Sequence, residues 1–109
     1  MEFAELPEFS RDLKRLKKKY LSLDDDFQRL RDVLSEIPKG NGGKHWNRLH
    51  EQENLCIYKV RLACAYLRRD NMRVIYAYQE EPAKIEFIEL YYKGEKDNEE
   101  KERIKQYLH

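Results

Sequence analysis

Apolar residues recur along this chain with two different periods, and the period changes near the middle. In the first part they recur every three or four positions, which is typical of amphipathic helices. Pro7 suits the first position of one helix, while Ser22 is expected to cap a second helix that ends before Pro38. The two apolar stripes are Phe9, Leu13, Leu16 and Tyr20, and Leu23, Phe27, Leu30, Leu34 and Ile37. With only a short link between them, these helices are expected to form an antiparallel hairpin.

The second half of the chain alternates between apolar and polar residues, which is typical of strands. Three strands are predicted over residues 55–64, 72–78 and 84–92, with turns at 68–71 and 80–82. In the first of them, the residues expected on one face are Cys56, Tyr58, Val60, Leu62 and Cys64.

Weaker signals complete the prediction. A loose alternation over residues 2–6 indicates a short strand before the first helix. After Gly94, Asp97 is expected to cap a last helix whose apolar side consists of Ile104, Tyr107 and Leu108. Residues 38–54 are rich in glycine and polar side chains, and they are expected to be the only long loop, anchored by Trp46 and Leu49.

This order of elements predicts an α+β fold. The N-terminal strand and the helical hairpin would pack on one face of an antiparallel meander sheet, followed by a short C-terminal helix. A length of 109 residues suits one domain over residues 1–109. No apolar run approaches the roughly 18 residues of a membrane span, and Met1–Ser10 lacks the apolar core of a signal peptide, so a cytoplasmic protein is expected. Cys56 and Cys64 lie too far apart in one strand to pair and are expected to be buried.

The charges of the chain nearly cancel, at net +1, but they are unevenly distributed. Residues 41–79 contain seven basic and three acidic side chains, whereas residues 80–109 contain six and nine. Lys59 and Arg61 share one strand face about 7 Å apart, and hairpin pairing would bring Arg73 beside them. Three cations on one face repel each other unless an anion lies between them, and a phosphate suits that place. The alternative is that they are ordinary solvent-facing residues of an uncovered sheet face.

Other motifs give weaker signals. His45 and His50 do not have the spacing of a helical metal site, and a surface role is favoured for both. The run Gly40–Gly43 lacks the strand–loop–helix context of a phosphate-binding loop.

Several segments, taken in this order, resemble the RelE/ParE superfamily of bacterial and archaeal toxins. They are Phe9–Leu16, Ile57–Ala63, Met72–Tyr76 and Ile88–Lys96, and the resemblance covers nearly the whole chain. It implies a microbial-ribonuclease-like domain, and the RelE/HigB-like branch is favoured. That branch enters the ribosomal A site and cuts mRNA by attack of the 2′-hydroxyl on the neighbouring phosphate, without a metal or other cofactor.

The resemblance also implies roles for particular residues and partners. Lys59 and Arg61 would bind the phosphate and stabilise developing charge, and Arg73 would grip the scissile phosphate. Contacts to RNA are expected from Lys93, Tyr91, Tyr92, Lys44, Arg48 and His45, with a tyrosine stacking on a base. The expected partners are the ribosome, mRNA and a cognate antitoxin whose acidic amphipathic segment covers the toxin in a hetero-oligomer; no membrane is expected.

Two alternatives remain open because the match to the family site is incomplete. Gly94 follows Lys93 where RelE has an arginine. The resemblance also implies a catalytic tyrosine near the C-terminus, and in the final helix only Tyr107 is available for that role. His45 or His50 would then supply the acid or base. The first alternative is a ParE-like inhibitor of DNA gyrase. The second is a family member without catalysis that acts as an interaction domain, which the low net charge favours.

Overall fold

The structure of the protein, a computed structural model, describes all residues from Met1 to His109. Its strands form one sheet in the order β1-β5-β4-β3-β2, in which β1 runs parallel to β5 and the other neighbours are antiparallel. The elements are β1 (Glu2–Glu5), α1 (Pro7–Lys17), α2 (Leu23–Glu36), β2 (Trp46–Gln52), β3 (Leu55–Cys64), β4 (Arg69–Gln79), β5 (Lys84–Tyr92) and α3 (Lys101–Tyr107). The predicted α+β fold is confirmed, and the predicted meander forms part of a five-stranded mixed sheet.

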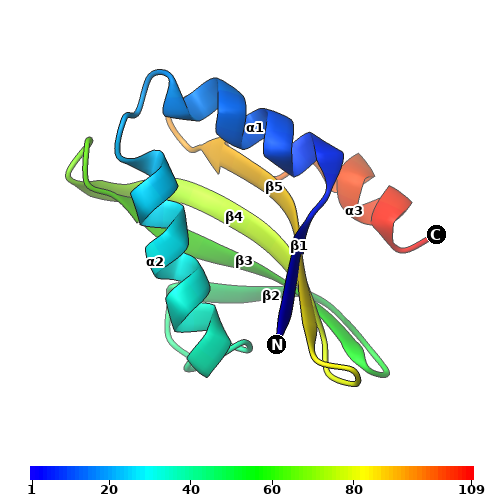
Figure 1. Cartoon of the computed structure of the whole chain (residues 1–109). Helices are drawn as coiled ribbons and strands as arrows, with labels where there is room; N and C mark the ends of the chain where they lie inside the picture. Colours follow the sequence, from blue (N-terminus) through cyan, green and yellow to red (C-terminus); the bar gives the residue numbers. More distant parts are fainter.

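The sheet face beneath α1 and α2 carries the main hydrophobic core (Figure 1). The β3 residues predicted to share a face all point into this core and meet the apolar stripes of the two helices. Phe87 of β5 links the layers, with its ring centroid 5.3 Å from that of Phe9 and 4.7 Å from that of Phe27. Burial of these large apolar side chains is what holds both helices on this face.

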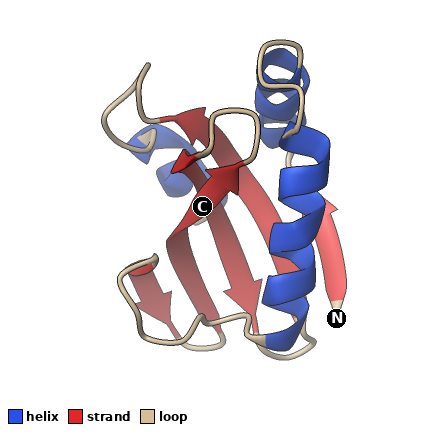
Figure 2. Cartoon of the chain, turned by 90° about the vertical axis from the view of Figure 1, so that its left-hand side faces the viewer, coloured by secondary structure: helices blue, strands red, loops and turns tan.

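The two helices meet at a corner rather than side by side. In Figures 1 and 2, α2 runs along the side of the sheet while α1 crosses above it, so the predicted antiparallel pairing of the helices is wrong. The reason is that α1 packs on β5 whereas α2 packs on β3, and β4 lies between these strands.

Residues 38–54 are not a continuous loop, because they contain β2. This strand pairs with β3 from Trp46 opposite Val60 to Gln52 opposite Leu55. The register shifts between Arg48 and His50, which places a β-bulge at Leu49. A bulge moves the following side chains to the other face and destroys the alternation on which strand prediction depends.

The turn between β3 and β4 lies at residues 65–68, not at the predicted 68–71. Arg68 adopts a left-handed φ of 57°, and β4 begins at Arg69. Ser22 was expected to cap α2 but makes no capping bond. Its hydroxyl instead donates to Asp26 Oδ2 at 2.7 Å and accepts from the Tyr66 N–H at 2.8 Å, so it fixes this turn onto α2.

The opposite sheet face buries a smaller cluster under α3. This cluster consists of Ile57, Ile75, Ala77, Ile88 and Tyr91. Ile104, Tyr107 and Leu108 pack against it, as predicted. The predicted cap at Asp97 is wrong: the side chain of Glu100 accepts from the Glu102 N–H at 3.3 Å.

The two cysteines are buried and unpaired, as predicted. None of the three helices combines the length and the hydropathy needed to cross a membrane.

Candidate functional site

Three cationic side chains lie together on the sheet face that carries α3. Arg61 of β3 is directly opposite Arg73 of β4, and Lys59 lies two positions before Arg61 on the same face. The pairing predicted from strand parity is therefore confirmed, and we call these three residues the cationic cluster. Like charges directly opposite each other in a sheet are destabilising, so this arrangement requires compensating anions.

Lys59 meets such an anion from a distant part of the chain. Its Nζ donates to Glu99 Oε1 at 2.8 Å, and the two side chains are only 20% and 10% exposed. Burial alone would raise the pKa of Glu99, but the hydrogen bond from Lys59, a backbone hydrogen bond and the charges of Lys59 and Lys101 together hold that pKa below its ordinary value. Glu99 is therefore ionised at neutral pH and neutralises Lys59.

Asp70, at the start of β4, is the common neighbour of the arginines and of one histidine. Arg61 Nη1 lies 3.6 Å from Asp70 Oδ2, and His45 Nδ1 lies 4.0 Å from the same oxygen. Arg73 Nη1 donates to the backbone carbonyls of Asp70 at 2.6 Å and Met72 at 3.0 Å. His45, expected to contact RNA, is thus brought beside the cationic cluster.

Tyr91 of β5 adjoins the cationic cluster, opposite Arg73 in the register. Burial, followed by the charges of Glu99 and Glu89, raises the pKa of Tyr91 to about 12, against a lowering contribution from Arg73. Its phenol is neutral at physiological pH. The residue is only 3% exposed, so in this conformation its ring does not offer a surface on which a base can stack.

The remaining predicted RNA contacts lie apart from the cationic cluster. Tyr92 points to the helix side of the sheet, where its ring lies 5.2 Å from that of Tyr20. Arg48 is opposite Tyr58, which belongs to the same helix-side core, and pairs with Glu51 at 3.0 Å. Lys44 and Lys93 are exposed, and Lys93 is fixed only through its backbone N–H, which donates to Asn71 at 2.9 Å.

Sequence reasoning missed the segment that contacts Lys59 of the cationic cluster. Residues 93–100, which we call the covering segment, connect β5 to α3 and supply Glu99. The buried carboxylate of Glu89 anchors this segment by accepting from the Lys96 ammonium and from the Glu100 N–H. The acidic excess of residues 80–109 was the only sequence signal of this contact.

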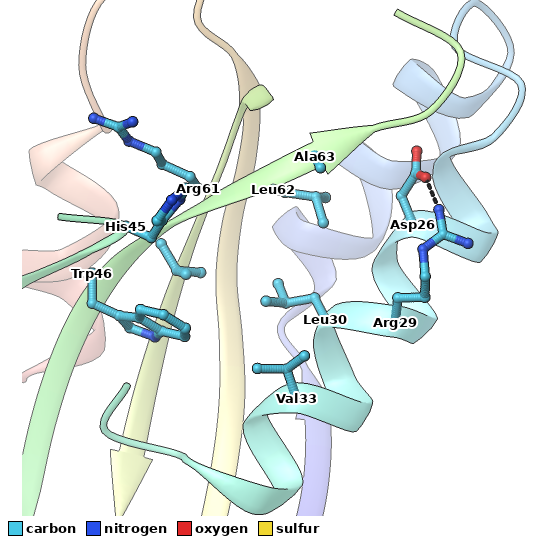
Figure 3. A pocket seen from close by; sticks show the side chains of 10 residues that line it. Asp26, Arg29, Leu30, Val33, His45, Trp46, Arg61, Leu62 and Ala63 are labelled. Carbon is cyan, nitrogen blue, oxygen red and sulfur yellow. Dashed lines mark hydrogen bonds and ion pairs between the residues drawn. The ribbon is translucent and has the colours of Figure 1, made fainter. Parts of the chain in front are cut away.

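A groove lies beside the cationic cluster, between α2 and the end of β3 (Figure 3). It has a volume of about 340 Å³ and an apolar floor formed by Leu30, Val33, Trp46, Val60 and Leu62. Figure 3 shows Arg61 pointing away from α2, while the Asp26–Arg29 pair lies on the helix side. No three His, Cys, Asp or Glu side chains are grouped so that they could hold a metal ion.

No family model matches the sequence, and no curated protein matches it. A solved structure does resemble the fold. The crystal structure of the archaeal RelE–RelB complex from Pyrococcus horikoshii OT3 contains a chain that superposes with a TM-score of 0.64. The match covers 85% of this protein and 94% of that chain, at 20% sequence identity. The fold is RelE-like, which confirms the fold implied by the sequence resemblance.

Proposed function

We propose that this protein is the toxin of a toxin–antitoxin pair and that it cuts mRNA on the ribosome. The observation that carries the proposal is the cross-strand pair Arg61–Arg73 with Lys59 on the same face. Three cations held together by a rigid sheet form a site for a phosphate, and guanidinium groups bind phosphate oxygens with two hydrogen bonds. The RelE-like fold supports the same proposal.

The proposed reaction uses the RNA itself as nucleophile. The 2′-oxygen loses its proton and attacks the adjacent phosphorus, the bond from phosphorus to the 5′-oxygen breaks, and that oxygen takes up a proton. The products are a cyclic phosphate and a free 5′-hydroxyl. Negative charge increases on the phosphoryl oxygens in the transition state, so Arg61, Arg73 and Lys59 would accelerate the reaction by stabilising that charge.

The proposed partner is an antitoxin with an acidic amphipathic segment. The similar solved structure is itself a RelE–RelB complex, which supports a partner of this class. An acidic segment placed over the cationic cluster would neutralise Lys59, Arg61 and Arg73 and exclude RNA from them.

The decisive experiment adds the purified protein to translating ribosomes and maps the ends of the mRNA. We expect new 5′-hydroxyl ends within the A-site codon, and we expect Arg73→Ala to reduce the cleavage rate by about 10²–10³-fold because one transition-state contact is lost. Arg11→Ala removes the same charge from the exposed surface of α1 and serves as the matched control. Intact mRNA, or cleavage by Arg73→Ala at the rate of Arg11→Ala, would refute the nuclease.

The second candidate is a gyrase inhibitor, which needs no phosphate site. All three members of the cationic cluster already have acceptors within the protein, and this leaves them less available to an RNA phosphate. A supercoiling assay separates the two functions. Inhibition of gyrase by a protein that leaves mRNA intact would favour this second candidate.

A further inference from the structure

The covering segment places a carboxylate where the proposed function requires a phosphate. Glu99 Oε1 accepts from Lys59 Nζ at 2.8 Å, and a phosphate oxygen would accept from the same ammonium group. Because the Lys59 side chain is only 20% exposed, a phosphate reaches it only when the carboxylate moves away.

We propose that the covering segment is an internal competitor of RNA: Glu99 occupies the anion site of Lys59, and a phosphate binds there by displacing it. This inference rests on the proposed function, since it concerns the same cationic cluster. The members of the cluster then differ in their access to a phosphate. Arg61 and Arg73 remain partly accessible, whereas Lys59 becomes accessible only after Glu99 has been displaced.

The covering segment is attached by few contacts. It contains neither helix nor strand, and no backbone–backbone hydrogen bond involves Asp97, Asn98 or Glu99. Its anchors flank this stretch, at Lys96 and at Glu100, and both use Glu89. Segments with few backbone hydrogen bonds open locally at a small cost in free energy, so Glu99 can leave Lys59 while Glu89 retains its partners.

Charge distribution supports competition rather than simple burial. Residues 41–79 have an excess of four positive charges, and residues 80–109 have an excess of three negative charges. Contact between Glu99 and Lys59 joins these two regions. RNA, with one negative charge per nucleotide, is a stronger polyanion than this segment and would replace it at low salt.

The test compares two substitutions that remove the same charge from the same segment. Glu99→Gln weakens the contact with Lys59. Glu95→Gln is the matched control, because Glu95 pairs at 3.3 Å with Arg15 on α1, outside the cationic cluster. The probe is a single-stranded RNA oligonucleotide with 2′-O-methyl groups, which cannot be cleaved by its own 2′-oxygen, and binding is followed by fluorescence anisotropy over a range of salt concentrations.

We expect Glu99→Gln to bind this oligonucleotide about three- to tenfold more tightly than Glu95→Gln. Its slope of log K against log salt should equal that of Glu95→Gln, because the same phosphates are bound once Glu99 has been displaced. In a Lys59→Ala background the advantage of Glu99→Gln should disappear, because the competition acts through that ammonium. Melting curves of all variants show whether each one is folded.

Binding by Glu99→Gln that is no tighter than binding by Glu95→Gln overturns the inference. Loss of mRNA cleavage in Glu99→Gln without tighter binding also overturns it, and would instead place Glu99 in proton transfer. If Glu99→Gln gains affinity but neither it nor the wild type cuts mRNA on ribosomes, the competition stands and the nuclease proposal fails. If the wild type cuts mRNA and Glu99→Gln gains no affinity, the nuclease stands and the competition fails.

Discussion

The sheet face beneath α1 and α2 buries a cluster of 18 residues, whereas the face that carries α3 buries a cluster of five. The larger cluster is apolar apart from its tyrosine hydroxyls, and that of fully buried Tyr76 donates to the Pro38 carbonyl at 2.7 Å. The smaller cluster lies next to the cationic cluster on the same strands, β3 and β4. Because the first face supplies most of the apolar burial, the second face is free to carry charges that contribute little to folding.

A single strand shows this division residue by residue. Every second position of β3, from Cys56 to Cys64, is buried on the helix side. The positions between them change along the strand from buried Ile57 through Lys59 and Arg61 to exposed Ala63. Neighbouring residues of one strand thus serve folding and the candidate site separately, since their side chains never share a face.

The largest expected effect comes from breaking the helix-side face. Phe87→Ala removes a fully buried ring that contacts Phe9 and Phe27, and such substitutions cost about 3–5 kcal/mol in the free energy of unfolding. Urea unfolding followed by circular dichroism measures this loss. Ile104→Ala, on the half-buried side of α3, is the counterpart on the other face and should cost about 1 kcal/mol. Equal losses would show that the two faces contribute equally to stability.

A smaller effect is expected where the two faces are joined around the edge of the sheet. Asp12 of α1 accepts from the Leu90 N–H at 3.1 Å and from Arg103 of α3 at 2.6 and 3.0 Å. Asp12→Ala leaves a buried N–H and a guanidinium without their acceptor, at a cost of about 2 kcal/mol. Urea unfolding gives the total loss, and hydrogen exchange locates it.

Amide exchange should become faster in α3 than in α2 in this variant, because Arg103 loses its partner while the main core stays intact. Asp12→Asn retains one acceptor oxygen and should fall between the wild type and Asp12→Ala. Unchanged exchange in α3 would contradict the view that this ion pair fastens α3 to the rest of the protein.

The helix-side face was largely predictable from the sequence, because its elements repeat a regular pattern. β3 and β5 have the bounds that alternation predicts, and the helix stripes point into the core as expected, except for Ile37, which is exposed. β2 was missed because the bulge at Leu49 breaks that alternation. The pairing of Arg61 with Arg73 was predictable since it follows from strand parity and hairpin connection.

The partners of the cationic cluster were not predictable in the same way. Glu99 lies 40 residues after Lys59, in a segment without periodicity. Its position depends on buried Glu89, which points to the α3 side because the register of β5 shifts near Ile88. Neither the shift nor the fold of the covering segment leaves a local sequence pattern, so only the net acidity of the last residues indicated the contact.

The smallest expected effect concerns Tyr91, whose pKa is raised to about 12 by burial, Glu99 and Glu89. The unfolded chain has the ordinary value of 10.0, so the folded protein holds this proton more tightly. Its contribution to stability is complete below about pH 10 and is lost as pH rises through about 12. The free energy of unfolding, measured with urea across this range, should therefore fall more steeply with pH in the wild type than in Tyr91→Phe.

A second measurement follows the pKa of Tyr91 directly, by the near-ultraviolet absorbance of tyrosinate. This pKa should be lower in Glu99→Gln, because a repelling charge is gone, and unchanged in Glu95→Gln. An equal Tyr91 pKa in both variants would show that Glu99 does not lie against the cationic cluster in solution.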